Sequence, residues 1–280
     1  MSKRRERKVV KKNGVTELFT AEKLCNSILA VGVPDNLAKQ VCSIVDESID
    51  SGVSTDKIFL TTRNYIHEFN PRMAAIYSLE RGLSALGPSG FLFEQYVAAL
   101  FREMGYRVKT NVYGEGEGVT HEIDVWAEKG NNVFVVEAKY RNDFRAKTHI
   151  NQVMYADARL QDIARQARKN GDAREYYMWV VTNTRFTDNA MNYVQYRKMQ
   201  LMGWDYPKYI NLKKIVFEKK LYPVTVLPSI TKQALKKLSQ KDLVLVSMIQ
   251  DHDVNFFHHD LGLSMTLSKK LVAEVVELMT

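Results

Sequence analysis

The sequence predicts an α/β protein of the α+β type, in which a central mixed sheet is flanked by helices. Three observations predict it. The first 86 residues show helical periodicity, residues 106–182 contain several strand patterns between helical ones, and helical patterns return after residue 221. Gly87-Pro88-Ser89-Gly90 is the clearest break in the chain. We therefore expect three parts: residues 1–87, 88–220 and 221–280.

The first part is expected to be helical with a hairpin at its start. Lys8–Val10 and Val15–Phe19 read as short strands joined by a tight turn that includes Lys11-Lys12-Asn13-Gly14. Thr20 precedes the first helical pattern as an N-cap. Helices are expected over residues 21–31, 35–50, 55–69 and 71–86.

The second and third parts differ in their patterns. In the second part we expect, in order, a helix at 91–104, strands at 106–112, 122–128 and 133–140, a helix at 150–169, a strand at 176–182, a helix at 187–202 and a strand at 210–216. In the third part we expect a small helical region with helices at 230–238, 241–250 and 268–279. The order of the second part describes a sheet covered by helices.

The composition is that of a soluble, basic protein. Of its 280 residues 45% are hydrophobic and 26% charged, and the net charge is +8. No stretch approaches the roughly 20 apolar residues of a membrane span, and no apolar segment follows the basic N-terminus, so we expect a cytoplasmic protein without membrane contact. Cys25 and Cys42 are the only cysteines and are expected to be buried, reduced thiols. The positive charge favours polyanionic partners.

A group of charged residues lies in two neighbouring predicted strands. Alternation places Asp124 on one face of its strand, and it places Glu137 and Lys139 together on one face of the next. Between the strands, Gly130-Asn131 is typical of a two-residue hairpin turn. With that turn, Asp124 lies directly opposite Glu137, and such residues have Cβ atoms about 4.5–5.5 Å apart.

This arrangement is suited to holding a divalent metal ion. Two facing carboxylates raise each other's pKa, and a bound cation removes the repulsion. Oxygen ligands favour Mg²⁺ or Mn²⁺, and Lys139 is placed to orient the attacking water or help deprotonate it. Glu94, in the preceding helix, is a further candidate carboxylate. The alternative is a solvated strand face, but charges within the apolar run Val133–Val136 need a reason.

These residues resemble a known nuclease core. The helix with Glu94, then Asp124, then Glu137-Ala138-Lys139 look like the core of the PD-(D/E)xK nucleases, in their Mrr-like restriction-endonuclease branch or their Holliday-junction-resolvase-like branch. Residues 179–190 resemble the strand–loop–helix that closes Mrr-like nuclease domains. The resemblance covers residues 89–206. It implies that Asp124 and Glu137 bind metal, that Lys139 acts on the water, and that Glu94 and Gln152 assist. His121 stands where many Mrr-like members have glycine; a structural or exposed role for it is expected over phosphate contact.

The first part resembles a nucleotide-binding module. Its hairpin with two lysines and the helix that follows look like the ATP-cone, which senses ATP or dATP. Lysine charge beside a helix N-terminus suits an anion. The resemblance implies that ATP or dATP is contacted by Val9, Lys11, Lys12, Glu17, Thr20, Lys23 and Thr55. The alternative is a basic hairpin that touches DNA.

The third part offers weaker signals. Its lysines 232, 236, 237 and 241 suit either DNA backbone contacts or a solvated face, and His258-His259-Asp260 is not expected to bind metal.

Together these patterns predict a Mg²⁺- or Mn²⁺-dependent DNA endonuclease that is regulated by ATP or dATP and forms a homo-oligomer, a dimer or larger. The main alternative is a nucleotide-responsive DNA-binding protein with an inactive nuclease fold. A third, a phosphohydrolase acting on the nucleotide, is disfavoured because the sequence has no Gly-x-x-x-x-Gly-Lys-Ser/Thr loop.

Overall fold

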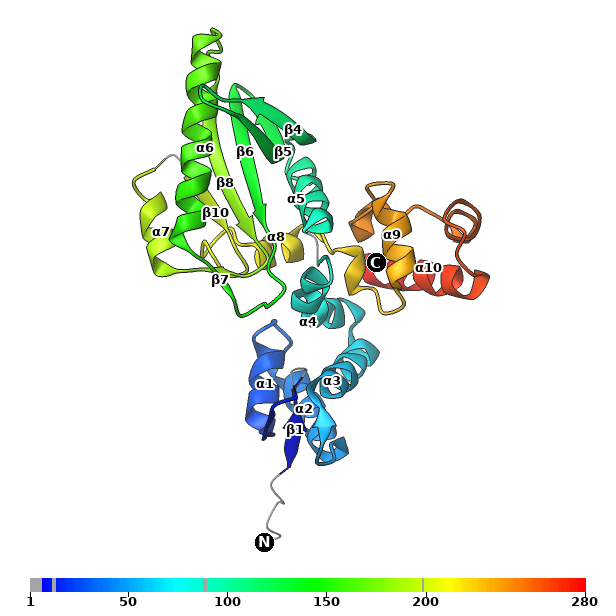
Figure 1. Ribbon diagram of the computed structural model, residues 1–280. Helices are drawn as coiled ribbons and strands as arrows, with labels where there is room; N and C mark the ends of the chain where they lie inside the picture. Colours follow the sequence, from blue (N-terminus) through cyan, green and yellow to red (C-terminus); the bar gives the residue numbers. More distant parts are fainter. Residues whose placement is uncertain (1–6, 12–13, 88–89, 198) are drawn as a thin grey trace. The chain divides into compact units, whose positions relative to one another are not determined.

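The protein consists of two compact units, residues 1–78 and residues 79–279. The structure is a computed structural model (Figure 1) that describes residues 7–11, 14–87, 90–197 and 199–280. Among these residues no helix is both long and apolar enough to cross a bilayer. The two units are described separately.

The first unit combines a small mixed sheet with helices. Its elements are β1 (Lys8–Val10), β2 (Thr16–Leu18), α1 (Ala21–Leu29), α2 (Asp35–Ser48), β3 (Val53–Ser54), α3 (Thr55–Phe69) and the first part of α4 (Pro71–Ser84). The predicted hairpin is confirmed, since β1 and β2 are antiparallel. The third strand was not predicted: β3 pairs parallel to β1 and gives the order β2-β1-β3. Two residues are too few for a sequence pattern to identify a strand.

One expectation for the first unit is wrong. Cys25 of α1 and Cys42 of α2 are joined in a disulfide rather than standing as reduced thiols. Their Cα atoms lie 5.6 Å apart, which is within the usual range for such a bond. Both helices contribute to one hydrophobic core, which includes Ile28 and Val41. Helical periodicity predicts that both cysteines lie near this core, but it gives no register between α1 and α2.

The second unit contains the predicted mixed sheet flanked by helices. Its first elements are α5 (Phe91–Glu103), β4 (Arg107–Glu115), β5 (Thr120–Lys129), β6 (Asn132–Lys139), β7 (Lys147–Thr148), α6 (Ile150–Lys169), β8 (Glu175–Thr182), β9 (Arg185–Phe186), α7 (Asp188–Val194), β10 (Met199–Met202) and α8 (Leu212–Glu218). The five-stranded sheet has the order β10-β8-β6-β5-β4. Strands β4, β5 and β6 are antiparallel, whereas β6, β8 and β10 are parallel.

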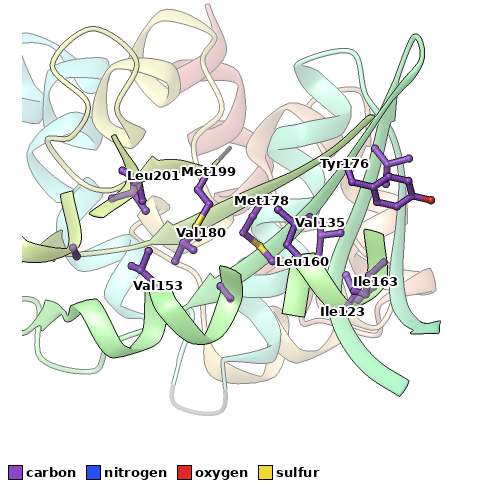
Figure 2. Packing of buried hydrophobic residues seen from close by; sticks show 14 of the residues in the cluster. Ile123, Val135, Val153, Leu160, Ile163, Tyr176, Met178, Val180, Met199 and Leu201 are labelled. Carbon is purple, nitrogen blue, oxygen red and sulfur yellow. The ribbon is translucent and has the colours of Figure 1, made fainter. Parts of the chain in front are cut away.

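Successive side chains along the central strands point to opposite faces of the sheet, and those on each face pack in a hydrophobic core. On one face, Val135 and Met178 pack with Val153 and Leu160 of α6, as Figure 2 shows. On the other face, Trp179 of β8 meets an aromatic ring of α5 edge-on. The strands in the middle of the sheet are therefore buried on both sides, which explains why β6 reads as a nearly continuous apolar run.

Helix α5 is buried on more than the face expected from its pattern. Phe93 and Tyr96 point inward as predicted, but Gln95 is also buried. Its side-chain nitrogen donates to the Ser239 carbonyl oxygen at 3.0 Å and to a carboxylate oxygen of Asp242 at 2.6 Å. The C-terminal region thus covers the outer side of this helix.

The C-terminal region is mostly helical, with short irregular pieces. It contains η1 (Val224–Val226), α9 (Lys232–Ser239), η2 (Val246–Met248), η3 (Phe256–Asp260) and α10 (Met265–Met279). The helix expected at 241–250 is wrong. Asp242 has a φ of 57°, and Leu245 forms a β-bridge with Pro223, so this stretch is largely extended before the single turn of η2.

One further expected helix is too long, and one expected strand is a helix. The helix expected at 187–202 ends at Val194, because Met199–Met202 forms β10 and pairs with β8. The strand expected at 210–216 is the helix α8, which Asn211 caps by accepting from the Lys214 backbone nitrogen. In both cases pairing or capping beyond the local pattern decides the structure.

Candidate active site

The β5–β6 hairpin has the register expected from its turn. Lys129 pairs with Asn132, so Gly130 and Asn131 are the two turn residues, and Gly130 has a φ of 59°. Since Asn131 has no positive φ, the turn is of type II′. The ladder continues to Val125 opposite Val136 and ends there, and Asp124 and Glu137 are the next residues along the two strands.

Asp124 lies where the sheet ladders are interrupted. The β4–β5 pairs pass from Thr110–Val125 to Val112–Ile123 without including Asp124, and Asn111 in between has a φ of 54°. The carboxylate of Asp124 reaches sideways instead, accepting a hydrogen bond of 2.8 Å from the Ala138 backbone nitrogen. This interaction fixes one oxygen of Asp124 between Glu137 and Lys139 along β6.

The carboxylates near this point are electrostatically strained. Burial, followed by the nearby charge of Glu137, raises the pKa of Asp124 to about 7. Burial also raises the pKa of Glu94, and the charges of Glu122 and Glu137 add to the effect. Several carboxylates therefore share a region that lacks enough positive charge to keep them all ionised.

Glu137 is held by two cations. Its side chain is almost fully buried, and its two oxygens form ion pairs with Lys139 and Arg159. Arg159 comes from α6, which covers this face of the sheet, and its side chain is 12% exposed, against 31% for Lys139. Arg159 is not among the residues predicted for the site. The available signal was a charged residue at an inward position of α6, three residues after Ala156 and four before Ile163.

The oxygen ligands fit a hard divalent cation. Asp124 and Glu137 together supply carboxylate oxygens next to unbalanced negative charge. Among the described residues, no three His, Cys, Asp or Glu side chains gather closely enough to hold a metal without further ligands. A two-carboxylate site is nevertheless typical of Mg²⁺, which keeps several waters and uses one or two carboxylates together with substrate phosphate.

Gln152 and His121 have neighbours of their own. The Gln152 side-chain oxygen accepts from Arg141 at 2.6 Å and from the His149 backbone nitrogen at 3.2 Å at the start of α6. Gln152 is thereby linked to the residues that follow β6. His121 lies 2.8 Å from a carboxylate oxygen of Asp162, which agrees with the structural role expected for it.

The predicted nucleotide contacts lie in the first unit. Lys11 forms an ion pair of 2.5 Å with Glu17, and this hydrogen bond is the main cause of the lowered pKa of Glu17. Lys23 is near enough to lower that pKa further. Val10 pairs with Ser54, so Thr55, the first residue of α3, follows directly beside the end of β1.

Three further positions complete this set. Thr20 is at the N-cap position of α1, but its side chain makes no capping hydrogen bond. The side chain of Val9 is buried in the core of the first unit, so a ligand would meet its backbone. Lys12 lies outside the described residues.

The remaining candidates of the C-terminal region have structural contacts. Lys237 donates to the carbonyl oxygen of Leu261 at 2.5 Å and to that of Gly262 at 3.1 Å. His258 interacts through Nδ1 with the Leu263 carbonyl oxygen at 2.7 Å.

Comparison with known proteins defines the class. Residues 87–206 match the family model described as restriction endonuclease, and residues 222–279 match the one described as AF1548-like, C-terminal. The mixed sheet, its covering helices and this match define a protein with a restriction-endonuclease domain of the Mrr, or PD-(D/E)xK, type.

The family of the chain is shown by similarity that covers nearly the full length of known proteins. An uncharacterized protein of Archaeoglobus fulgidus is 32% identical over 178 residues, which are 64% of this chain and 97% of that protein. The crystal structure of a protein of unknown function, AF1548, is similar with a TM-score of 0.58 and 29% identity, covering 67% of this chain and 96% of that one. The chain belongs to the family of the Archaeoglobus protein.

Proposed function

We propose that this protein is a Mg²⁺-dependent DNA endonuclease that hydrolyses phosphodiester bonds. One observation carries the proposal: in a restriction-endonuclease domain, the Asp124 carboxylate accepts a hydrogen bond from the Ala138 backbone nitrogen, between Glu137 and Lys139, and the charge of Glu137 helps to raise its pKa. A nuclease domain implies a DNA substrate, and PD-(D/E)xK nucleases generally use Mg²⁺.

Each residue of the site has a proposed role. Asp124 and Glu137 would hold the ion, which would make a bound water more acidic and would neutralise charge on the scissile phosphate. Lys139 leaves Glu137 to orient the attacking water and to stabilise negative charge as it develops. The ammonium is suited to this exchange because its side chain is more exposed than that of Arg159.

Three residues assist from nearby. Arg159 stays on the second oxygen of Glu137 and fixes the orientation of that ligand. Glu94 would add negative charge beside the ion, which its raised pKa and the nearby charge of Glu137 support. Gln152 positions Arg141, and through it the chain that follows Lys139.

The first unit is proposed to bind ATP or dATP. Support comes from the basic hairpin of Lys11 beside Glu17 and Lys23, and from Thr20, whose hydroxyl is not used as a cap. A helix N-terminus and lysine charge suit phosphate groups. Nucleotide binding can regulate cleavage only if it favours one conformation or one oligomer over another. A homodimer would present one active site to each strand of a duplex.

Cleavage of supercoiled plasmid by the full-length protein tests this function. Wild type with Mg²⁺ should convert the plasmid to nicked or linear form, EDTA should stop the reaction, and Glu137→Gln should be inactive. Glu115→Gln, an exposed residue of β4, is the control and should cleave normally. Parallel reactions with ATP and dATP test regulation. Plasmid binding without cleavage by wild type would contradict the proposal and favour the DNA-binding alternative with an inactive nuclease fold.

A further inference from the structure

The loop after β10 displays an exposed aromatic side chain between two cations. Tyr209 is 76% exposed, and the ammonium groups of Lys208 and Lys214 each lie 5.8 Å from the centre of its ring. The next residue, Ile210, is also exposed. A large ring that is open to water and flanked by two positive charges makes little contribution to the core and is accessible to a ligand.

The loop is tied down on both sides of this ring. Asn211 is buried, and its side-chain nitrogen donates to the carbonyl oxygens of Pro207 and Lys208 at 3.2 and 3.4 Å. Gly203 holds the two ends of the loop together through its backbone. Its nitrogen donates to the backbone carbonyl oxygen of Tyr206 at 2.7 Å, and its carbonyl oxygen accepts from the backbone nitrogen of Leu212 at 2.9 Å. The ring is thus presented by an ordered segment, which lowers the entropy cost of binding.

The loop begins at the C-terminal end of β10, and Lys139 lies at the C-terminal end of the parallel strand β6, so both are at the same end of the strands. In the parallel part of the sheet, Lys139 pairs with Thr182, and Val181 pairs with Met202 at the end of β10. Neighbouring strands are about 4.8 Å apart, so the start of the loop is roughly 10 Å from Lys139 across β8. The start of this loop is therefore only a few nucleotides' length from a scissile phosphate at the candidate active site.

The chemistry of the loop selects the ligand. Tyrosine is common at protein interfaces, but lysine is depleted there. Proteins that bind unpaired nucleic acid instead combine lysine charge for phosphates with aromatic rings on which bases stack. Bases within an intact duplex are already stacked and offer no free face to such a ring.

We propose that Tyr209 is a stacking site for an unpaired base of the DNA substrate, with Lys208 and Lys214 on the adjacent phosphates. The proposal deepens the DNA endonuclease function and rests on it. It assigns a substrate class: DNA that contains unpaired or opened nucleotides close to the cleavage position.

Binding measurements on the full-length protein test this site. Fluorescence anisotropy is followed in EDTA, which prevents cleavage, with labelled single-stranded, forked and blunt duplex oligonucleotides. Wild type should prefer the single-stranded and forked DNA. Tyr209→Ala should weaken binding to these two by about 5–100-fold while changing blunt duplex binding little, and Tyr209→Trp should restore it. Tyr113→Ala, an exposed tyrosine on β4 at the opposite edge of the sheet, is the control and should bind like wild type.

Two outcomes separate this proposal from the endonuclease function. If wild type cleaves DNA with Mg²⁺ but Tyr209→Ala weakens all three DNAs equally, or none, the stacking site is wrong and the function stands. If wild type does not cleave but Tyr209→Ala still loses affinity only for unpaired DNA, the endonuclease function is wrong and the stacking site stands. An unchanged melting temperature of Tyr209→Ala excludes misfolding as the cause.

Discussion

Two lysine–glutamate pairs lie beside strands of this protein, one in each unit, and they differ in burial. Lys11 and Glu17 are each about one-third exposed, whereas the Glu137 side chain next to Lys139 is only 4% exposed. A pair open to solvent contributes about 0–1 kcal/mol and is readily given up. A buried carboxylate must keep a partner, and removing that partner costs about 3–5 kcal/mol.

The difference teaches what each site is suited to bind. In the first unit the lysine can leave Glu17 for a phosphate at little cost, so the exposed pair suits an anion that comes and goes. At the active site the negative charge is larger than two cations can balance, because Asp124 and Glu94 also have raised pKa values. That region suits a cation.

The largest expected effect separates the two lysines. Lys139→Met should lower the rate of DNA cleavage by about 10²–10⁴-fold, because the attacking water loses its orienting group, while Mn²⁺ still binds. Lys11→Met should leave the nucleotide-free rate unchanged. Single-turnover cleavage with Mg²⁺ measures both. Equal rates for Lys139→Met and wild type would remove the distinction between the two pairs.

The second effect concerns the other cation on Glu137. Arg159→Gln should weaken Mn²⁺ binding and cleavage by about 10–100-fold, because Glu137 loses the group that orients it. Arg159→Lys should recover part of this loss. Arg165→Gln, at an exposed position of the same helix, is the matched control. Calorimetric titration with Mn²⁺ measures the affinities, and an affinity equal to that of wild type would show that Arg159 does not position the ligand.

The third prediction concerns how the stability of the fold changes with pH. Burial and the charge of Glu137 raise the pKa of Asp124 from its ordinary value of 3.8 to about 7 in the metal-free fold, so the folded form binds the proton more tightly than the unfolded form. Its contribution to stability is therefore present at low pH and is lost as the pH rises from about 4 to 7. Asp124→Asn should remove this loss and raise the metal-free melting temperature at pH 8 by at least roughly 2–4 °C. A lower melting temperature for the variant at pH 8 would contradict the assigned repulsion.

The smallest effect belongs to the exposed pair. Glu17→Gln removes the partner of Lys11. This substitution should change the free energy of unfolding of the nucleotide-free protein by less than about 1 kcal/mol. ATP should still raise the melting temperature of this variant, whereas it should raise that of Lys11→Met much less. Differential scanning fluorimetry with ATP and dATP measures both. If Lys11→Met responds to nucleotide like wild type, this hairpin is not the binding site.

The sequence was sufficient to predict the hairpin that builds the active site. A two-residue turn at Gly130-Asn131 fixes the register down to Val125–Val136, and one further step of the same register predicts that Asp124 lies close to Glu137. The sideways turn of Asp124 onto Ala138 could not be predicted, because it depends on an interrupted ladder next to Asn111.

Contacts between residues that are far apart in the chain could not be predicted from the sequence. Arg159 is 22 residues after Glu137 in the chain, and only the packing of α6 on the sheet brings the two side chains together. Met199–Met202 was predicted as helix because its pairing partner, β8, is invisible to a local pattern. The disulfide between Cys25 and Cys42 was missed for the same reason, since it depends on how two helices face each other.

The most direct test of the central claim is a Mn²⁺ titration of the metal-free protein by calorimetry. The account predicts a saturable site in wild type that is lost in Asp124→Asn and in Glu137→Gln, and kept in Glu17→Gln. A site that persists with the same affinity when both Asp124 and Glu137 are replaced would contradict it.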